Sequence, residues 1–434
     1  MLAPFLLTCA CLAQGPRTYD LSAATALLDS ELPNLLGNVV VLVHQGPHEV
    51  FRYRAGTLTA DTQVRLASLT KTVSAAVVLA LQDEGRLQVG ETLGATLGGL
   101  VPGFGTPGLG QPTLLDCFSM RSGIESPQPF EWLPLFDLAQ SVRRVGATAA
   151  LAFPPGAQLA YEGSGMQCTG YVCELRLGLP WGDLAESRIF APTGMTRSDY
   201  LYFDPNPAVA GGMRGSADDL ARFGRMVLAG GMSGATRVLS EGAVTQLFTN
   251  GTRGLPVFRT PFPATHPDYP HGVDPDYGFG GWVLAEHPQT QHVEEIVGAG
   301  AFGSFIWLDR RRGLSAVLVT DLPAAGGGQG SLDAALGLYR ILRQATESEQ
   351  VAALCAAHQG PTVRLTWRSP VRARFTQLYG STQPIRDTAD LRAATLLGRV
   401  RGESADVAPF AHYAALAELR PITNLALVPG ANSL

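Results

Sequence analysis

Lysine is almost absent from this chain of 434 residues, which carries 31 arginines and a single lysine, Lys71. Long runs of like charge are absent as well, and the net charge of -5 is spread along the sequence. Nucleic acids and anionic membrane surfaces are bound through concentrated basic patches. The sequence therefore argues against both partners and favours small or neutral ones.

No apolar run has the length of a membrane span. Residues 2–13 (LAPFLLTCACLA) form a short apolar stretch that ends on small residues before Gln14. A basic leading segment is missing, but the pattern still predicts a signal segment, residues 1–13, that is cleaved after Ala13. We therefore expect an exported protein, whether periplasmic, on the cell surface or secreted.

Cysteine and histidine nowhere show the spacing of a zinc site, and His266 and His271 fall in a proline-rich loop. We expect no metal and no other cofactor. Four cysteines remain beyond the signal segment, an even number that an oxidising compartment could pair in three ways. Two of them fall on one expected helix at a spacing that is awkward for a mutual disulfide. Buried free thiols are therefore favoured for at least some of Cys117, Cys168, Cys173 and Cys355.

The one lysine stands three residues after Ser68, in Ser68-Leu69-Thr70-Lys71, and an almost wholly apolar run follows at 72–81. Such a run predicts a buried helix that begins at the motif and ends near Gly85. Residues three apart share a helix face, so the hydroxyl and the amine should lie within reach. Burial and the positive end of the helix favour a neutral amine, which can activate a serine without histidine. The alternative is a serine cap beside a surface lysine.

Five segments resemble, in the same order, the serine β-lactamase and penicillin-binding-protein superfamily, especially its class C and esterase-like branches. SLTK at 68–71 matches the first motif, Ser-x-x-Lys. Residues 155–171 resemble the segment with the second motif, Tyr-x-Asn, and 189–200 resemble the turn that follows it. Residues 210–231 are similar to the next helix. Residues 298–320 resemble a strand pair that opens on the third motif, Lys or His, any residue, then Gly.

The resemblance implies a role for each matching residue. Ser68 would be the acylated nucleophile, Lys71 its base, and Tyr161 the group that relays protons to the leaving group and later to water. The backbone amides of Ser68 and Ala301 would form the oxyanion hole. Tyr161 could instead be an ordinary core or surface tyrosine. The third-motif strand could be a tight strand entry without a catalytic role; its residues are Gly298, Ala299 and Gly300.

Two positions depart from the family's pattern. Gly163 stands where the second motif usually has Asn, and Gly298 stands where the third usually has Lys or His. Both missing side chains normally help to hold a β-lactam or a D-alanyl peptide. The resemblance therefore favours a serine hydrolase of esterase type, acting on a small ester or amide. A β-lactamase, a D-alanyl-D-alanine carboxypeptidase, and a non-catalytic binding or adhesion protein remain alternatives.

The pattern of expected elements predicts an α+β domain over residues 20–348. Residues 38–44 and 49–54 are typical of an antiparallel hairpin, 305–308 and 314–320 of another, and 331–345 of an amphipathic helix. Strands at both ends would share one antiparallel sheet covered by helices, with the site beside a helical region. The long loop at 253–277 is expected to line or cover the site, unless it is a passive surface excursion.

A second, all-β domain is expected over residues 355–418. Short alternating stretches at 361–367, 375–379, 394–400 and 411–416 resemble a fibronectin type III sandwich, with Trp367 and Tyr413 as its core aromatics. Such a domain could bind cell-surface or extracellular partners. Residues 419–434 resemble a linker or the opening strand of a further module, cut off before it can pair, and a disordered tail is the alternative.

Overall fold

The computed structural model describes residues 19–261, 276–287, 290–323 and 328–347, together with seven strands between 352 and 427. The expected signal segment and most of the long loop lie outside these residues. The chain divides into two compact units, one spanning Ala23–Tyr339 and the other containing the seven C-terminal strands. Each unit is described by itself.

A six-stranded antiparallel sheet is the centre of the first unit, and it joins strands from both ends of that unit. The strands from the two ends share one sheet, as predicted, and Val40 of β1 (Val39–Gln45) pairs with Val319 of β14 (Leu314–Val319). The order across the sheet is β11 (Trp282–Glu286), β12 (Val293–Ala299), β13 (Phe305–Asp309), β14 (Leu314–Val319), β1 (Val39–Gln45) and β2 (His48–Ala55). The α+β fold expected for this part is thereby confirmed.

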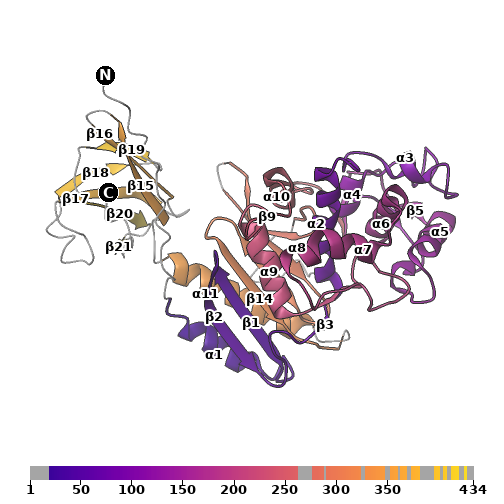
Figure 1. Cartoon of the computed structure of the whole chain (residues 1–434), viewed down its shortest axis with the longest axis horizontal. Helices are drawn as coiled ribbons and strands as arrows, with labels where there is room; N and C mark the ends of the chain where they lie inside the picture. The colour runs from indigo at the N-terminus through magenta and orange to yellow at the C-terminus, as the bar shows by residue number, and fades with distance from the viewer. Residues whose placement is uncertain are drawn as a thin grey trace. The chain divides into compact units, whose positions relative to one another are not determined.

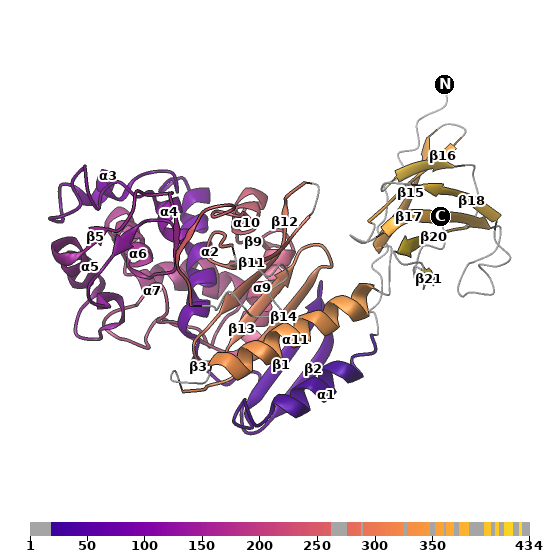
Figure 2. The same ribbon diagram turned by 180° about the vertical axis from the view of Figure 1, so that it is seen from behind.

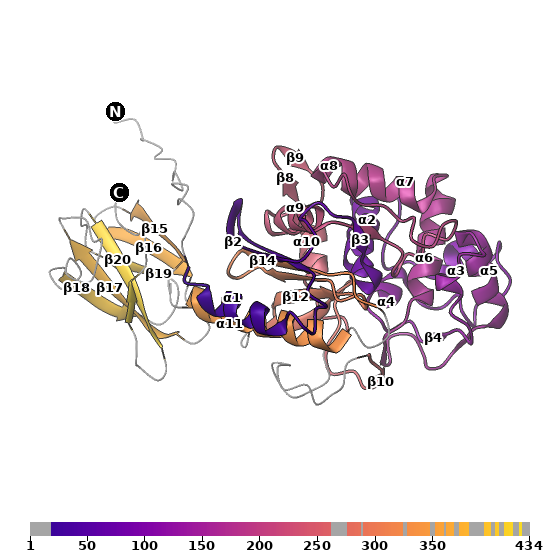
Figure 3. The same cartoon turned by 90° about the horizontal axis from the view of Figure 1, so that it is seen from below.

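Helices cover both faces of this sheet (Figures 1 and 2). One face carries α1 (Ser22–Glu31) and α11 (Gly328–Glu347), where Tyr339 stacks on Trp307 of β13 at 4.9 Å. The other face carries α9 (Ala217–Leu228), and the three layers are seen edge-on in Figure 3. A Cβ on Gly224 of α9 would meet Ser315 at 3.0 Å and Leu308 at 3.2 Å, which indicates close helix-to-sheet packing.

The helical region begins with α2 (Thr70–Asp83), which is buried along nearly its whole length, as its apolar sequence predicts. Gly85 follows it in the left-handed conformation that a helix end requires. The other helices of this region are α3 (Leu93–Leu97), α4 (Leu114–Phe118), α5 (Leu138–Thr148), α6 (Ser164–Leu177), α7 (Trp181–Ala185), α8 (Ala191–Thr193) and α10 (Glu241–Leu247). Single turns occur at η1 (Ala67–Leu69), η2 (Phe130–Trp132) and η3 (Glu186–Phe190).

Short two-stranded ladders tie the connecting segments together. They pair β3 (Val64–Arg65) with β7 (Arg214–Gly215), β4 (Ile124–Glu125) with β5 (Ala150–Leu151), β6 (Leu159–Ala160) with β10 (Val257–Arg259), and β8 (Met232–Ser233) with β9 (Thr236–Arg237). The first of these ladders holds the chain just before the serine motif. No described helix combines the length and apolar character needed to cross a bilayer.

The second unit holds two sheets. One has the order β15 (Ala352–Gln359), β16 (Thr362–Arg368), β19 (Ser404–Val407), and the other β18 (Thr395–Val400), β17 (Ala373–Ser381), β20 (His412–Leu419), β21 (Leu425–Leu427). The expectation of an unpaired opening strand within residues 419–434 is corrected here. Leu427 pairs with Leu416, because a short apolar strand at a sheet edge gains hydrogen bonds by joining it.

Candidate active site

Ser68 lies on the one-turn helix η1, directly between β3 and α2. Leu66 donates a backbone hydrogen bond to Met213 at 3.0 Å, which fixes the approach to this turn. Ala67 has a φ of 45°, an unfavourable conformation for a residue with a side chain. Such strain is held only where the surrounding structure imposes it, often at functional sites. The turn presents a half-buried serine at the foot of α2.

Lys71 is enclosed by protein, with 2% of its surface exposed. Its Nζ lies 3.1 Å from Ser68 Oγ and donates a hydrogen bond to the carbonyl of Ala210 at 2.9 Å. The predicted approach of the hydroxyl and the amine is therefore confirmed, and the alternative of a surface lysine is wrong. This distance allows a proton to pass between the two atoms.

Aromatic rings line the rest of the lysine's surroundings. Nζ lies 4.7 Å from the ring centre of Tyr161 and 5.6 Å from that of Trp132. Tyr161 stacks on Trp282 at 5.0 Å and meets Tyr277 edge-on at 5.9 Å. The structure thus brings Tyr161 to the site, but the lysine faces its ring. Its predicted role as a proton relay stays a prediction.

The end of β12 lies against the serine turn. A Cβ on Gly300 would collide with the carbonyl of Leu66, so this position requires glycine. A Cβ on Gly298 would lie 2.5 Å from Thr72 Oγ1, which leaves no room for the Lys or His of the third motif. Ala301 follows at the exposed end of the strand. The third-motif strand is therefore beside Ser68, while the oxyanion hole formed by the Ser68 and Ala301 amides stays a prediction.

Two carboxyl groups that the motifs do not name lie beside the second motif. Glu131 of η2 is 7% exposed, and burial raises its pKa while the charge of Lys71 lowers it. Glu162 accepts hydrogen bonds from Gly165 N at 2.9 Å and Ser122 Oγ at 3.1 Å. Burial raises the pKa of Glu162 to about 7 in spite of these bonds. Gly163 directly follows Glu162 in the chain, and a Cβ on Gly163 would lie 3.2 Å from the carboxyl group of Glu131.

The segments that flank the long loop also reach the site. Tyr161 N donates to the carbonyl of Arg259, at the end of β10, at 2.9 Å. Tyr277, which ends the loop, packs against the Tyr161 ring. Residues 262–275 lie outside the described residues, so the predicted lid stays a prediction. His266 and His271 lie there too. Within the described residues, no group of three metal-binding side chains is found.

The described cysteines in this unit are buried free thiols, as expected for at least some of them: Cys117, Cys168 and Cys173. Burial raises the pKa of the Cys117 and Cys168 thiols well above the usual value, and this makes them unreactive. The side chain of Cys355 lies outside the described residues.

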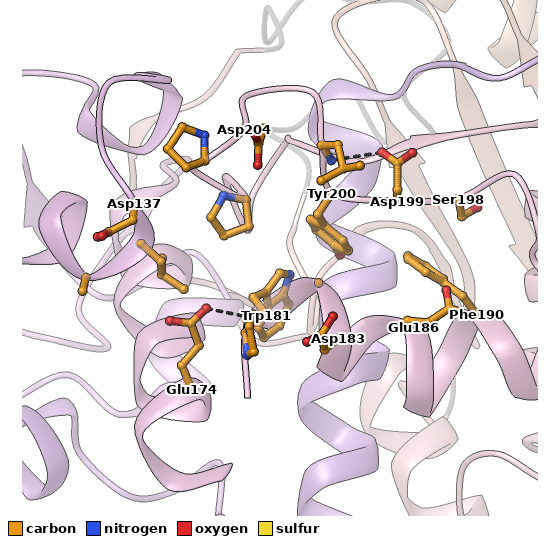
Figure 4. A pocket seen from close by; sticks show the side chains of 17 residues that line it. Asp137, Glu174, Trp181, Asp183, Glu186, Phe190, Ser198, Asp199, Tyr200 and Asp204 are labelled. Atoms are coloured by element: carbon orange, nitrogen blue, oxygen red, sulfur yellow. Dashed lines mark hydrogen bonds between the residues drawn. The ribbon is translucent and has the colours of Figure 1, made fainter. Parts of the chain in front are cut away.

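A separate pocket of about 520 Å³ opens between α7 and the segment Ser198–Pro207 (Figure 4). Tyr200 and Trp181 form its inner wall, and their rings meet edge-on at 5.8 Å. Carboxyl groups gather around it: Asp137, Glu174, Asp183, Glu186, Asp199 and Asp204. The Tyr200 hydroxyl and Ser74 Oγ of α2 lie 2.7 Å apart. A residue that lines this pocket therefore contacts the helix on which Lys71 lies.

Comparison with known proteins identifies a family for most of the chain. Residues 31–337 match the beta-lactamase family. This range includes the serine motif, the second-motif segment and β12, the strand that leads into the third motif. The seven C-terminal strands lie beyond it.

Solved structures share the fold. A Bacteroides dorei protein described only provisionally as a beta-lactamase is 24% identical, with a TM-score of 0.67 over 76% of this chain and 100% of that one. EstCE1, a hydrolase with promiscuous acyltransferase activity, is 17% identical, with a TM-score of 0.57 over 74% and 99%. A D-stereospecific amidohydrolase from Streptomyces is 22% identical, with a TM-score of 0.51 over 73% and 98%. At these identities the likeness establishes the fold.

Proposed function

The chain belongs to the beta-lactamase family, and from that premise we propose that it is a serine hydrolase of esterase type that forms an acyl-enzyme on Ser68. One observation carries the proposal: the only lysine of the chain is buried and lies 3.1 Å from the Ser68 hydroxyl. A chain that uses arginine for nearly every other cation keeps at this position the one cation that can lose its proton.

The proposed reaction has two steps. In the first, Lys71 takes the proton of Ser68 while Oγ bonds to the carbonyl carbon of the substrate, and the amides of Ser68 and Ala301 stabilise the oxyanion. The alcohol leaves with a proton that passes from Lys71, through Tyr161. In the second, water attacks the acyl carbon, its proton returns by the same route, and Ser68 is released.

Esters are favoured over β-lactams because of two glycines. Gly163 and Gly298 lack the polar side chains that hold a β-lactam in related proteins, and a Cβ at Gly298 would meet Thr72. An ester needs less help in expelling its leaving group than an amide does. The hydrolase EstCE1 and the Streptomyces amidohydrolase, which share the fold, make both bond types reasonable candidates.

The proposal is tested with short-chain p-nitrophenyl esters on the wild type, Ser68→Ala and Lys71→Arg. Ser126→Ala is the matched control, because that serine is half-buried like Ser68 and its hydroxyl donates a hydrogen bond to the nearby carbonyl of Gln128. We expect both site variants to lose at least about 100-fold in rate and the control to match the wild type. Equal rates in all four proteins would refute the assignment. A chromogenic cephalosporin should be cleaved slowly; rapid cleavage would favour a β-lactamase instead.

We also propose that the protein is exported and that residues 355–418 form a fibronectin type III-like module. The two sheets, one of three strands and one of four, support the second proposal. N-terminal sequencing of the mature protein should begin at Gln14. An uncleaved product in the cytoplasm would contradict export. If the ester assay fails, a binding or adhesion role through this module becomes the better explanation of the chain.

A further inference from the structure

A carboxyl group from another part of the chain limits the space for a side chain at position 163, where the residue is glycine. A Cβ on Gly163 would lie 3.2 Å from both Cγ and Oε1 of Glu131, and 3.3 Å from the Cβ of Ala210. The backbone of Gly163, with a φ of -119°, would accept a side chain, so the conformation does not demand glycine. The space beside Gly163 is tight, and Glu131 and Ala210 border it.

Glu131 reaches this space from the lysine side of the site. Its neighbour Trp132 lies with its ring 5.6 Å from Lys71 Nζ. On its other side Glu131 approaches Gly163, which abuts Ala210, and the Ala210 carbonyl is the hydrogen-bond acceptor of Nζ. The carboxyl group therefore borders Gly163, the amine borders Ala210, and these two residues are neighbours in the protein interior.

Few other groups compete for this carboxyl group. Among the described residues no cationic side chain pairs with Glu131 within 4.0 Å, and Ser164 Oγ donates a long hydrogen bond at 3.4 Å. Arg259, the other cation that acts on it, is held by Glu125 at 3.0 Å. The remaining titratable groups nearby are Glu162, the unreactive thiol of Cys168, and Tyr161, whose ring faces Lys71 Nζ at 4.7 Å. Lys71 is the only buried cation in this group.

We propose that Glu131 is the buried counter-charge of Lys71, a positioning residue that stabilises the ammonium formed when Lys71 takes the proton of Ser68. This inference rests on the proposed function. The proton moves from Ser68 Oγ to Nζ as the Oγ–acyl bond forms, and a cation appears in a site lined by rings and one carbonyl. A carboxylate beside it lowers the cost of that charge.

The proposal fixes the sign of a pH effect. A negative charge stabilises an ammonium beside it, so removing the charge of Glu131 should favour the neutral amine. Removing the charge should move the midpoint of the rate–pH profile to lower pH by about one unit, the lower end of the effect of a nearby opposite charge. It should also lower the rate on the plateau by about tenfold, because the ammonium formed in the reaction loses its partner. A side chain that only fills space would lower the rate equally at every pH.

The experiment measures the rate at which a fluorophosphonate probe inactivates the full chain between pH 5.5 and 10. Glu131→Gln keeps the shape and removes the charge, and Glu131→Asp keeps the charge. Asp183→Asn is the control, because it removes the charge of an exposed carboxylate outside the site. We expect a shift in Glu131→Gln, and an unchanged midpoint in Glu131→Asp and in the control. If the midpoint of the rate–pH profile of Glu131→Gln equals that of the wild type, the proposal is wrong.

Failure of the proposed function would give a different result. The probe would then inactivate the wild type no faster than it inactivates Ser68→Ala. If Glu131→Gln does not fold, Gly163→Ala carries the test, because its Cβ pushes against Cγ and Oε1 of Glu131. We expect a smaller shift of the midpoint in the same direction. An unmoved midpoint in a folded Gly163→Ala protein would overturn the proposal as well.

Discussion

Replacing Gly298 by alanine should destabilise the protein at the junction between sheet and nucleophile helix. The new Cβ would lie 2.5 Å from Thr72 Oγ1 and 3.1 Å from Ile306 Cγ2, and both side chains are buried. Either α2 and β12 must separate, or Thr72 must turn and give up the hydrogen bond that it donates to Gly280 at 2.8 Å. Overpacking costs about 1–3 kcal/mol, and the lost bond adds about 0.5–1.5 kcal/mol. We therefore expect the free energy of unfolding to fall by about 2–4 kcal/mol. The proposed ester hydrolysis should slow as well, because Thr72 follows Lys71 in the chain.

Urea denaturation measures this change, with Thr72→Ala as the second arm of a double-mutant cycle. Removing Oγ1 clears the collision, so Gly298→Ala should cost about 1–2 kcal/mol less in the Thr72→Ala background. Gly182→Ala is the matched control, because a Cβ there meets no atom within 4 Å and the position is helical. The reasoning fails if Gly298→Ala matches the control, or if the Thr72→Ala background gives no relief.

Three further predictions concern single side chains. Lys71→Arg should lose at least about 100-fold in ester hydrolysis while remaining folded by circular dichroism, because guanidinium cannot act as a base at neutral pH; retained activity would count against the mechanism. The buried thiols of Cys117 and Cys168 should react with an aromatic disulfide reagent only after denaturation, and fast labelling of the native protein would contradict their burial. Burial, with Arg225 nearby, lowers the pKa of His44 from 6.5 to about 4. Between these pH values the imidazole is neutral in the folded protein and protonated in the unfolded chain. The free energy of unfolding should therefore fall as the pH drops from 6.5 towards 4, and His44→Gln should weaken this dependence; an equal fall between pH 7 and pH 5 in the wild type and in His44→Gln, measured by urea denaturation, would exclude it.

Local patterns predicted the framework of the first unit because each element carries its own signal. The apolar run after Lys71 could only be a buried helix, and its serine and lysine meet as the three-residue spacing requires. The hairpin at β1 and β2 was visible from two stretches with strand-like patterns, 38–44 and 49–54, around Gly46-Pro47. The sharing of one sheet by strands from both ends was predicted, whereas the direct pairing of β1 with β14 was seen only in the structure.

The surroundings of Lys71 could not be predicted in the same way, because they come from segments distant in sequence and without a motif. Glu131 and Trp132 lie on a single helical turn about sixty residues away, and Tyr277 and Trp282 reach the site from the far end of a loop. One signal was present: Gly163 departs from the family's second motif, and the occupant of the vacated space is Glu131. The short strand β21 was also misjudged, since a three-residue apolar stretch does not reveal its partner.

Peptide mapping after labelling with a fluorophosphonate probe tests the central claim most directly. If the amine of Lys71 activates the hydroxyl beside it, the wild type should carry the label on Ser68, and Lys71→Arg should take it up at least about 100 times more slowly. A label on another residue, or equal labelling of the two proteins, would contradict the account.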